Sequence, residues 1–405
     1  MSHLEKFSLL NNRQHGFRCG RSCETQLAGL VDDLAQILDR RSQIDLCIMD
    51  FSKAFDMVPH QRLLIKLDHL GIRGATKRWI EGFLTKRHQK VLLEGKTSSS
   101  SPVNSGVPQG TVLGPLLFLA YINDLPDSVS SDVRLFADDL ILYREITSSR
   151  DSIKLQQDID SLSKWESTWQ MKFNTDKCFI MRMTHKKKPT QYQYKLRDAE
   201  LQEVDHHPYL GVELSKNLTW AKHITQISTK ANKMLGLLRR NLGNCKQSTK
   251  DIAYKTLVRP RLEYCSAVWD PHQKVHIDNL EKVQRRAARF VTNNYVKTSS
   301  VTKIIEDLKW DTLQKRRTMA RLTVLYKETH SKIPSNIHHL LADKGGKPQT
   351  RRYHKLNYDT IQTNKDCYRY SLYPRTIPLW NSLPPNVKLA TDTSNFKDLL
   401  ASAQI

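Results

Sequence analysis

Apolar residues along the chain follow two spacings, one typical of strands and one typical of helices. Nearly continuous apolar runs predict buried strands at 44–50, 133–136 and 140–143. Shorter runs predict further strands at 91–93, 171–173, 179–181 and 208–214. Apolar residues that recur every three or four positions predict helices, at 27–38, 59–70, 79–83, 116–123, 153–169, 224–242, 254–262, 277–291 and 312–329. We therefore expect strands and helices together up to about residue 220, and a helical pattern from there onward.

The strands at 133–136 and 140–143 flank an adjacent pair of carboxylates, Asp138 and Asp139. Two apolar runs around such a pair predict a short β-hairpin with both acids at its tip. Like charges placed side by side between buried strands are unfavourable unless a cation lies over them. Oxygen-only ligands favour Mg²⁺ or Mn²⁺ over zinc, so the pair is a candidate metal site. Taken alone, such a pair is more often a solvated acidic turn.

The strand at 44–50 ends on another acid, Asp50, and runs directly into the polar segment 51–56. In open sheets, ligand-binding groups follow the ends of buried strands, because the strand ends open onto a crevice. Asp50 is therefore a candidate third metal ligand.

Two glycine-bearing loops are further candidates for ligand contact. The segment 104–115 places three glycines and two prolines around Gln109, which indicates a backbone that must approach another group closely. A tight strand-to-helix connection is the other interpretation. The loop 14–22 carries Arg18 and Arg21 ahead of a helix. Either these arginines hold phosphate or they solvate a turn, and their spacing favours neither.

Composition adds a charge argument. The 405 residues carry 64 Lys and Arg against 41 Asp and Glu, a formal net charge of +23, which indicates a polyanionic partner such as nucleic acid. A basic but non-specific surface is the alternative. Many cations lie on the polar sides of the helices after residue 220, at Lys222, Lys230, Lys233, Arg239, Arg240, Lys282, Arg285, Arg286 and Arg289. Such a pattern suits a groove that follows a phosphate backbone, although solvated helix faces look the same.

No apolar stretch reaches the roughly 18 residues that a membrane span requires, and the N-terminus lacks the apolar core of a signal peptide. We therefore expect an intracellular protein. The seven cysteines are scattered without a regular framework, which agrees with that location. Cys19 and Cys23 have no histidine partners at a metal-binding spacing and are expected to be free, buried thiols.

Four segments in combination resemble the palm of reverse transcriptases, above all those of non-LTR retrotransposons of the jockey and CR1 kind. They read Asp-Phe-Ser-Lys-Ala-Phe-Asp at 50–56, Ser-Gly-Val-Pro-Gln-Gly at 105–110, Phe-Ala-Asp-Asp at 136–139 and Asn-Thr-Asp-Lys-Cys at 174–178. The resemblance runs from about Gln14 through the helices near residue 290. The motifs are highly specific in combination.

This resemblance implies an RNA-directed DNA polymerase that adds dNTPs to a primer 3′-hydroxyl with two Mg²⁺ ions, for which Mn²⁺ can substitute. It implies that Asp50 and Asp138 bridge the two metals, with Asp139 beside them as the second acid of its motif. The implied fold class is α+β, a right-hand polymerase with a palm of antiparallel sheet plus helices. The implied division is partial fingers at 1–45, palm at 46–215 with inserted fingers elements at 57–105, helical thumb at 216–295 and a basic helical tail at 296–405.

The resemblance also assigns residues to the substrate. Phe55 matches the aromatic gate that blocks a ribonucleotide 2′-hydroxyl, and an ordinary core phenylalanine is the alternative. Gln109 and Gly110 match the loop that lies against the templating pair and the incoming nucleotide. Lys177 matches a lysine that protonates pyrophosphate, although a surface lysine is nearly as common at this spacing. The segment 208–214 resembles the primer-holding hairpin.

Two departures from the family pattern affect the expected partners. Full elements of this kind resemble longer proteins with an N-terminal endonuclease, for which 405 residues leave no room. The family's Arg-Pro-Ile-Ser-Leu strand is absent before Gln14, so we expect an N-terminally truncated copy with a weakened grip on the triphosphate. The expected partners are an RNA template, a DNA primer, dNTPs and a separate endonuclease, and the expected location is the nucleus if the protein acts in target-primed insertion.

Two other functions remain open at this point. A catalytically inert nucleic-acid-binding remnant of such a polymerase predicts RNA or duplex binding with a steep salt dependence and no synthesis. An intron-type maturase is the weaker alternative, because it needs an RNA-splicing domain that the C-terminal segment does not announce.

Overall fold

The computed structural model describes residues 1–334, 340 and 355–403, and the chain divides into two compact units. Unit 1 comprises Met1–Gln26 and Arg41–Asp205, and unit 2 comprises Leu27–Arg40 and His206–Ile405. Residues 335–339, 341–354 and 404–405 of the expected basic tail at 296–405 lie outside the described residues.

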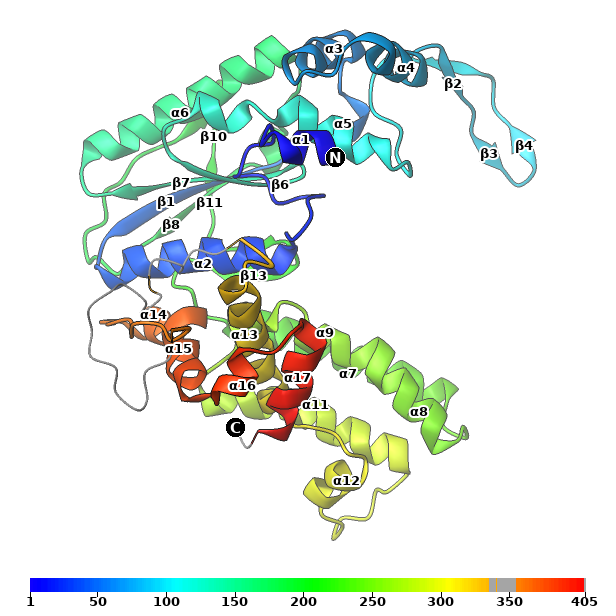
Figure 1. Cartoon of the computed structure of the whole chain (residues 1–405), viewed down its shortest axis with the longest axis vertical. Helices are drawn as coiled ribbons and strands as arrows, with labels where there is room; N and C mark the ends of the chain where they lie inside the picture. Colours follow the sequence, from blue (N-terminus) through cyan, green and yellow to red (C-terminus); the bar gives the residue numbers. More distant parts are fainter. Residues whose placement is uncertain (335–339, 341–354, 404–405) are drawn as a thin grey trace. The chain divides into compact units, whose positions relative to one another are not determined.

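Unit 1 is built on a sheet of five strands in the order β11-β8-β1-β7-β6 (Figure 1). Its neighbours are antiparallel except for β11 and β8, which run parallel. The strands are β1 (Gln43–Met49), β6 (Asp132–Phe136), β7 (Asp139–Ile146), β8 (Phe179–Met183) and β11 (Gln202–Glu203). Every residue of the central strand β1 is buried, which explains why its sequence is a nearly continuous apolar run.

Helices cover one face of this sheet, with α5 and α6 beside it and α3 packed on α5 (Figure 1). The core that they enclose takes Cys47 and Met49 from β1, Phe118 from α5 and Trp165 from α6. The helices that begin in unit 1 are α1 (Ser2–Lys6), α2 (Cys23–Asp39), α3 (His60–His69), α4 (Gly74–Leu84), α5 (Leu113–Ile122) and α6 (Ser149–Trp169), with 3₁₀ turns at Ala54–Asp56, Leu125–Ser128 and Thr175–Lys177. The rest of α2, from Leu27 on, belongs to unit 2.

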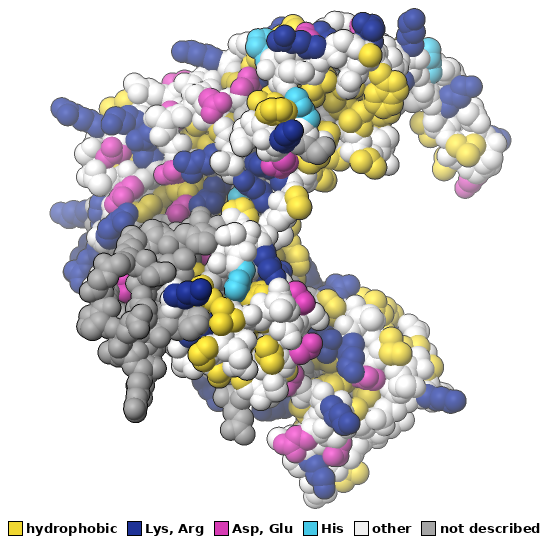
Figure 2. Space-filling model, in the orientation of Figure 1, with side chains coloured by type: hydrophobic (Ala, Val, Ile, Leu, Met, Phe, Trp, Pro, Cys, Tyr) yellow, Lys and Arg dark blue, Asp and Glu magenta, His cyan; other side chains and the backbone are white. Residues whose placement is uncertain are grey.

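The remaining strands of unit 1 form short two-stranded ribbons: β2 (Arg87–Gln89) with β5 (Ser101–Val103), β3 (Leu92–Leu93) with β4 (Lys96–Thr97), and β9 (Lys195–Leu196) with β10 (Ala199–Glu200). The strand predicted at 91–93 is present, but its side chains are exposed at the tip of its ribbon (Figure 2). The strand predicted at 171–173 was wrong, because only Phe173 pairs there, in an isolated bridge with Phe51.

Unit 2 begins with a hairpin of β12 (His206–Tyr209) and β13 (Val212–Ser215), which the expected division assigned to the palm. Helices follow: α7 (Ala221–Asn241), α8 (Gln247–Ala253), α9 (Arg259–Glu263), α10 (Ser266–Trp269), α11 (Lys274–Thr292), α12 (Val301–Asp307) and α13 (Leu313–Thr329). The helix predicted at 254–262 lies within a continuous helical stretch, in which Tyr254–Val258 is a π-helical segment that leads directly into α9. Pro260 lies in the first turn of α9, and its missing N–H agrees with the change in hydrogen bonding before it.

The described part of segment 296–405 is a packed helical layer. After α13 it contains α14 (Asp366–Arg369), α15 (Leu372–Ser382), α16 (Pro385–Lys388) and α17 (Thr393–Ser402). The rings of Tyr326 on α13 and Phe396 on α17 stack 4.3 Å apart, and Trp380 on α15 is fully buried. This segment therefore contributes a core of its own to unit 2.

None of the helices in the described ranges is long and apolar enough to cross a membrane. All seven cysteines are free. The expectation that Cys19 is buried was wrong, because it lies exposed in the loop before α2, and Cys23 is only half-buried.

Candidate active site

The backbone brings the three predicted acids to one end of the sheet in unit 1. Asp50 follows β1, Asp138 lies in the turn between β6 and β7, and Asp139 is the first residue of β7. The antiparallel register pairs Met49 with Leu140, and one step further along it Asp50 faces Asp139. Asp50 and Asp139, about 90 positions apart in the sequence, therefore lie at the same end of two paired strands.

These carboxylates influence one another electrostatically. Burial, then the charges of Asp138 and Asp50, raise the pKa of Asp139 to about 6. Burial is also the main cause that raises the pKa of Asp138; the charge of Asp50 adds to it, while a backbone hydrogen bond and Lys177 oppose it. Ionising all three acids together is therefore unfavourable unless a cation compensates them.

Lys177 lies next to Asp50, with its Nζ 3.2 Å from the Asp50 Oδ2. The loop that carries it is held against the end of β1, because the Asn174 N–H donates to the Asp50 carbonyl at 2.8 Å. Asn174 also caps the 3₁₀ turn at Thr175–Lys177 by accepting from the Asp176 N–H. The side chain of Lys177 is 65% exposed, so it can reach a bound molecule as well as Asp50.

The donor chemistry of this cluster fits a hard divalent cation. Its donors are carboxylate oxygens only, and their mutual repulsion is the kind that a cation relieves. Within the described ranges, however, no three His, Cys, Asp or Glu side chains converge closely enough to form a preassembled metal centre. At Asp50, the Lys177 ammonium provides the positive charge in this structure.

The glycine loop at 104–110 packs against the segment that follows Asp50. The Gly106 N–H donates to the Val58 carbonyl, and the Val107 N–H donates to the Phe55 carbonyl, both at 2.8 Å. A Cβ on Gly106 would lie 2.7 to 2.9 Å from the backbone of Asp56, and its φ of +85° is in the left-handed region. The close backbone approach predicted from the glycines is therefore an approach to the chain itself.

Further along this loop, Gln109 and Gly110 are exposed. The Gln109 Nε2 donates to the Asp56 Oδ1 at 2.9 Å, and nothing lies within 4 Å of a Cβ built on Gly110. Both residues therefore present polar groups and open space on the side of the loop away from the protein core.

Phe55 is half-buried in a row of three aromatic rings. It stacks on Phe118 at 4.4 Å, and the edge of Phe17 meets it at 6.2 Å. The stack on a fully buried ring fixes the orientation of Phe55. Phe55 is therefore neither a free surface ring nor a fully buried one, and Phe17, which the sequence did not single out, is its exposed neighbour.

Arg18 and Arg21 use their guanidinium groups within unit 1. The Arg18 Nε and Nη2 donate to the Glu5 carboxylate at 3.0 and 2.8 Å, and its Nη1 donates to the Asn11 carbonyl. The Arg21 Nη1 donates to the carbonyls of Asn12 and Gln14. In this arrangement both arginines stabilise the loop and the helix before it. A role of either arginine in holding phosphate stays a prediction.

Gln14 and Gly16, in the same loop, contact the turn that carries the acids, and the sequence did not reveal them. The Ala137 N–H donates to the Gln14 Oε1 at 2.9 Å, and the Gln14 Nε2 donates to the Ala137 carbonyl at 3.2 Å. Gly16 lies so close to the turn that a Cβ there would be 2.3 Å from the Ala137 nitrogen. Only the glycine gave a signal, since a backbone that must approach another segment closely requires one.

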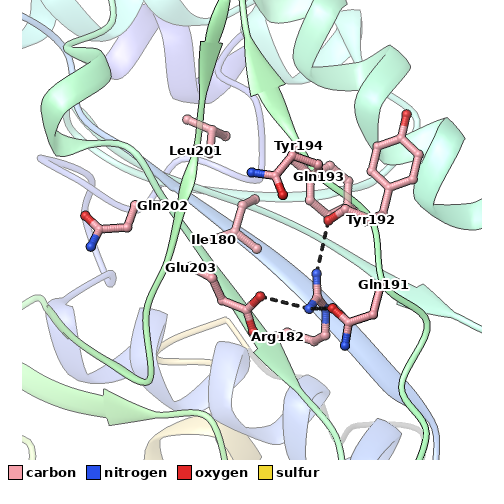
Figure 3. Close-up of a pocket in the computed structure, with 9 residues that line it drawn as sticks. All are labelled: Ile180, Arg182, Gln191, Tyr192, Gln193, Tyr194, Leu201, Gln202 and Glu203. Carbon is pink, nitrogen blue, oxygen red and sulfur yellow. Dashed lines mark hydrogen bonds and ion pairs between the residues drawn. The ribbon is translucent and has the colours of Figure 1, made fainter.

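A separate polar cavity of about 360 Å³ lies around Arg182, beside strands β8 and β11 at one edge of the sheet (Figure 3). Figure 3 shows Glu203 and Gln191 turned toward the Arg182 guanidinium. The Arg182 Nη1 donates to Glu203 at 2.8 Å, its Nη2 donates to the Tyr192 carbonyl at 3.1 Å, and Asp45 lies 3.6 Å from its Nε. Because two carboxylates already compensate this arginine, the cavity is not an anion site.

Comparison with known proteins identifies the class to which this fold and these acids belong. A family model described as reverse transcriptase (RNA-dependent DNA polymerase) matches residues 1–214, more than half of the chain. The chain belongs to the reverse transcriptase family. This membership, together with the antiparallel sheet and its helices, confirms the predicted α+β fold class of a right-hand polymerase.

The chain is similar to polymerases of insect mobile elements. The chain is 28% identical over 304 residues to a probable RNA-directed DNA polymerase from transposon X-element of Drosophila melanogaster, covering 72% of this chain and 33% of that protein. It is 27% identical over 304 residues to the RNA-directed DNA polymerase from mobile element jockey of Drosophila funebris, covering 71% of this chain and 33% of that protein. The chain thus spans about a third of the length of these relatives.

Among solved structures, apo telomerase from Candida tropicalis is 11% identical and aligns over 81% of this chain and 53% of that chain. Its TM-score is 0.44, too low to add to the argument.

Proposed function

We propose that this protein is an RNA-directed DNA polymerase that acts in retrotransposition. The single observation that supports the proposal most is the placement of Asp50, Asp138 and Asp139 at one end of the sheet, where their charges oppose one another. The relatives that it resembles are named as RNA-directed DNA polymerases of mobile elements. Acids that burial and mutual repulsion keep from ionising freely are typical of a site that awaits a cation.

In this proposal, Asp50, Asp138 and Asp139 hold two divalent cations, Mg²⁺ or Mn²⁺. When bound, such ions neutralise the triphosphate and favour ionisation of the primer 3′-hydroxyl. Lys177, which pairs with Asp50 and is largely exposed, gives a proton to the leaving pyrophosphate.

The nucleotide is selected by the residues around the acids. Phe55, held by its stack on Phe118, limits the space at the 2′ position of the sugar. Gln109 and Gly110, on the exposed side of the glycine loop, lie along the templating pair and the incoming nucleotide. Arg18 and Arg21 are left out of this set, since their guanidinium groups already bind the loop.

Template and primer bind to basic surfaces in this proposal. Helices α7 and α11 pack on each other and expose cations on their polar sides, and Figure 2 shows Lys and Arg side chains over the helices of unit 2. The exposed cations of these two helices are Lys222, Lys230, Lys233, Arg239, Arg240, Lys274, Lys282, Arg285 and Arg286. Lys222 is paired with Glu213, and Arg286 donates to Asn232. Cations of this kind bind a phosphate backbone without reading its sequence.

The proposed subdomains follow the family pattern. They are partial fingers at 1–45, palm at 46–215 with inserted fingers elements at 57–105, thumb at 216–295 and a C-terminal segment at 296–405. The hairpin of β12 and β13 is the proposed primer-holding element. A separate endonuclease would supply the nick for target-primed insertion in the nucleus.

Primer extension tests the proposal. Purified protein is given a DNA primer annealed to a homopolymer RNA template, with dNTPs and with or without Mg²⁺. We expect extension that depends on Mg²⁺ and that disappears in the double variant Asp138→Asn with Asp139→Asn, while circular dichroism shows an intact fold. If wild type and double variant extend the primer equally, the proposal is rejected. Salt-sensitive RNA binding without any extension by the wild type would identify an inert remnant instead.

A further inference from the structure

The turn that carries the acids is held by a side chain from far away in the sequence. Gln14 is 2% exposed, and both the oxygen and the nitrogen of its amide form hydrogen bonds. Its Oε1 accepts the Ala137 N–H at 2.9 Å and the Gly16 N–H at 2.6 Å, and its Nε2 donates to the Ala137 carbonyl at 3.2 Å. The amide thus contacts both polar groups of Ala137, the residue that directly precedes Asp138.

The backbone on either side of Gln14 reinforces this contact. The Leu135 N–H donates to the Arg13 carbonyl at 3.0 Å, and the His15 N–H donates to the Leu135 carbonyl at 2.8 Å. Gln14 and Leu135 form a parallel bridge, so the loop extends the edge of the sheet beside β6. The first loop and the turn between β6 and β7 are therefore joined by side-chain and backbone bonds together.

Ala137 itself adopts a conformation that needs support. Its φ is +53°, in the left-handed region that costs an alanine free energy relative to glycine. Gly16 permits the close approach of the loop, since a Cβ there would overlap the Ala137 nitrogen at 2.3 Å. The hydrogen bonds of Gln14 stabilise Ala137 in this strained conformation. They therefore also help to fix the position of the backbone of Asp138, the next residue.

We propose that Gln14 is a positioning residue for polymerisation: by holding the Ala137 peptide groups, it fixes where the carboxylates of Asp138 and Asp139 lie. This inference rests on the proposed function, because it assigns those acids to catalysis. In this role the buried Gln14 acts through Ala137 and not through direct contact with substrate or metal. Replacing Gln14 should therefore lower the rate of the chemical step and raise the Mg²⁺ concentration that is needed for half-maximal rate. It should leave the affinity for dNTP almost unchanged.

The chain offers a matched control for the loss of such a clamp. Gln43, fully buried in β1, contacts Thr190 in the same way: its Oε1 accepts the Thr190 N–H at 2.8 Å and its Nε2 donates to the Thr190 carbonyl at 2.9 Å. Gln43 lies at the opposite end of β1 from Asp50, roughly 20 Å away along the strand. The Gln43 Nε2 also donates to the Oδ1 of the buried Asp45 at 2.9 Å. Replacing Gln43 therefore removes three side-chain hydrogen bonds, as replacing Gln14 does, at a site away from Asp50, Asp138 and Asp139.

The first experiment compares Gln14→Ala and Gln43→Ala in single-nucleotide incorporation, with primer and template saturating. For Gln14→Ala we expect kcat to fall about 10- to 100-fold, since small displacements of catalytic groups have effects of this size. We expect its KM for dNTP to change less than about twofold, and its half-saturating Mg²⁺ concentration to rise several-fold. Gln43→Ala should lose comparable thermal stability yet keep the wild-type kcat and Mg²⁺ dependence. Equal losses of kcat in the two variants, or an unchanged kcat in Gln14→Ala, would overturn the proposal.

A second pair of variants guards against a simple failure to fold. Gly16→Ala forces the loop away from the turn but keeps the Gln14 amide, and Gly82→Ala in α4 places a Cβ where nothing lies within 4 Å. We expect Gly16→Ala to reproduce the lower kcat and higher Mg²⁺ demand, and Gly82→Ala to behave as wild type. A Gly16→Ala protein with wild-type kinetics would count against a clamp that depends on this close approach.

A readout without synthesis separates this inference from the proposed function. Hydrogen exchange at the Ala137 amide and Mn²⁺ binding are measured without dNTP in wild type and Gln14→Ala. Faster exchange together with weaker Mn²⁺ binding in the variant supports the positioning role. If the wild type makes no DNA, the proposed function fails while this result still stands. Unchanged exchange and unchanged Mn²⁺ binding would overturn the inference even if the wild type is an active polymerase.

Discussion

Two charge clusters in this protein have opposite compositions. In unit 1, three acids gather at the end of the sheet, with Lys177 paired to Asp50. In unit 2, one acid, Asp270, is surrounded by three arginines from α13 and α15. Asp270 is 5% exposed, so its charge depends on protein partners, whereas the acids of unit 1 are reached by solvent.

The arginine cluster has a structural explanation. The Arg317 Nε donates to the Asp270 Oδ1 at 2.7 Å, the Arg321 Nε donates to its Oδ2 at 3.0 Å, and the Arg375 Nη1 donates to its carbonyl at 2.8 Å. The residue after α10 is thereby tied to α13 and α15. A buried charge that has such partners stabilises one arrangement of helices, whereas a cluster of like charges without sufficient partners destabilises the fold and marks a binding site.

The largest expected effect comes from Asp50→Asn. We expect primer extension to slow by about a thousandfold or more, because one carboxylate of the proposed metal site is lost. The free energy of unfolding should not fall, since the substitution removes repulsion between acids. Rates from single-nucleotide incorporation and stability from urea titration check both parts. If Asp50→Asn strongly lowers the free energy of unfolding, Asp50 has a structural role like that of Asp270.

Asp270→Asn should have the reverse profile. Removing the negative charge leaves three arginines, two of them fully buried, without their common partner, so we expect the free energy of unfolding to fall by about 3 to 5 kcal/mol. The measurement is urea unfolding followed by circular dichroism. Primer extension by the protein that remains folded should stay near the wild-type rate. A loss of stability below about 1 kcal/mol would contradict the structural role given to this cluster.

Lys177→Ala sharpens the comparison, because it removes the cation paired with Asp50. The lysine side chain is 65% exposed, so the pair should contribute less than about 1 kcal/mol to stability. If Lys177 protonates pyrophosphate, the incorporation rate should nevertheless fall about 100-fold. Lys177→Arg is the matched control for charge. An alanine variant with a normal rate would leave Lys177 as a surface lysine.

The smallest expected effect is a dependence of stability on pH. The pKa of Asp139 is raised to about 6 in the folded protein, from about 3.9 when unfolded, so the folded state binds more protons between these values. Stability should therefore fall as pH rises from about 4 to 6, and Asp139→Asn should flatten this fall. Thermal unfolding in a pH series, with and without Mg²⁺, checks the sign. Stability that rises over this interval in the wild type, but not in the variant, would contradict the raised pKa.

The sequence predicted the strands that carry the acids in unit 1, because each of them depends on a local apolar run. The apolar run that ends at Asp50 and the two runs around Asp138 and Asp139 became β1, β6 and β7. The sequence could not reveal what the loops contact. Arg18 carries the charge that suggests phosphate, yet it binds Glu5, and Gln14 carries no such signal, yet it contacts the turn. Such contacts join segments that are far apart in the sequence, and the spacing of apolar residues does not predict them.

The sequence pattern also did not predict which large apolar side chains are exposed. Trp79 in α4 is 63% exposed, although its neighbour Ile80 is buried as the helical spacing requires. Similarly, the apolar strand β3 is exposed because it forms a ribbon with β4 alone, and two strands without a covering helix have no core. Apolar character predicts burial only where another element is present to cover it.

The bond between Gln14 and Ala137 spans 123 positions of the chain. During synthesis on the ribosome, Gln14 is made long before Ala137. Until Ala137 has been synthesised, the donors and acceptors of the Gln14 loop form hydrogen bonds with water. Closure of so long a loop carries an entropic cost, as does the pairing of β1 with β8, which joins Ile44 to Met183. A nascent chain therefore cannot hold its acids in place through Gln14 until the turn between β6 and β7 has been synthesised.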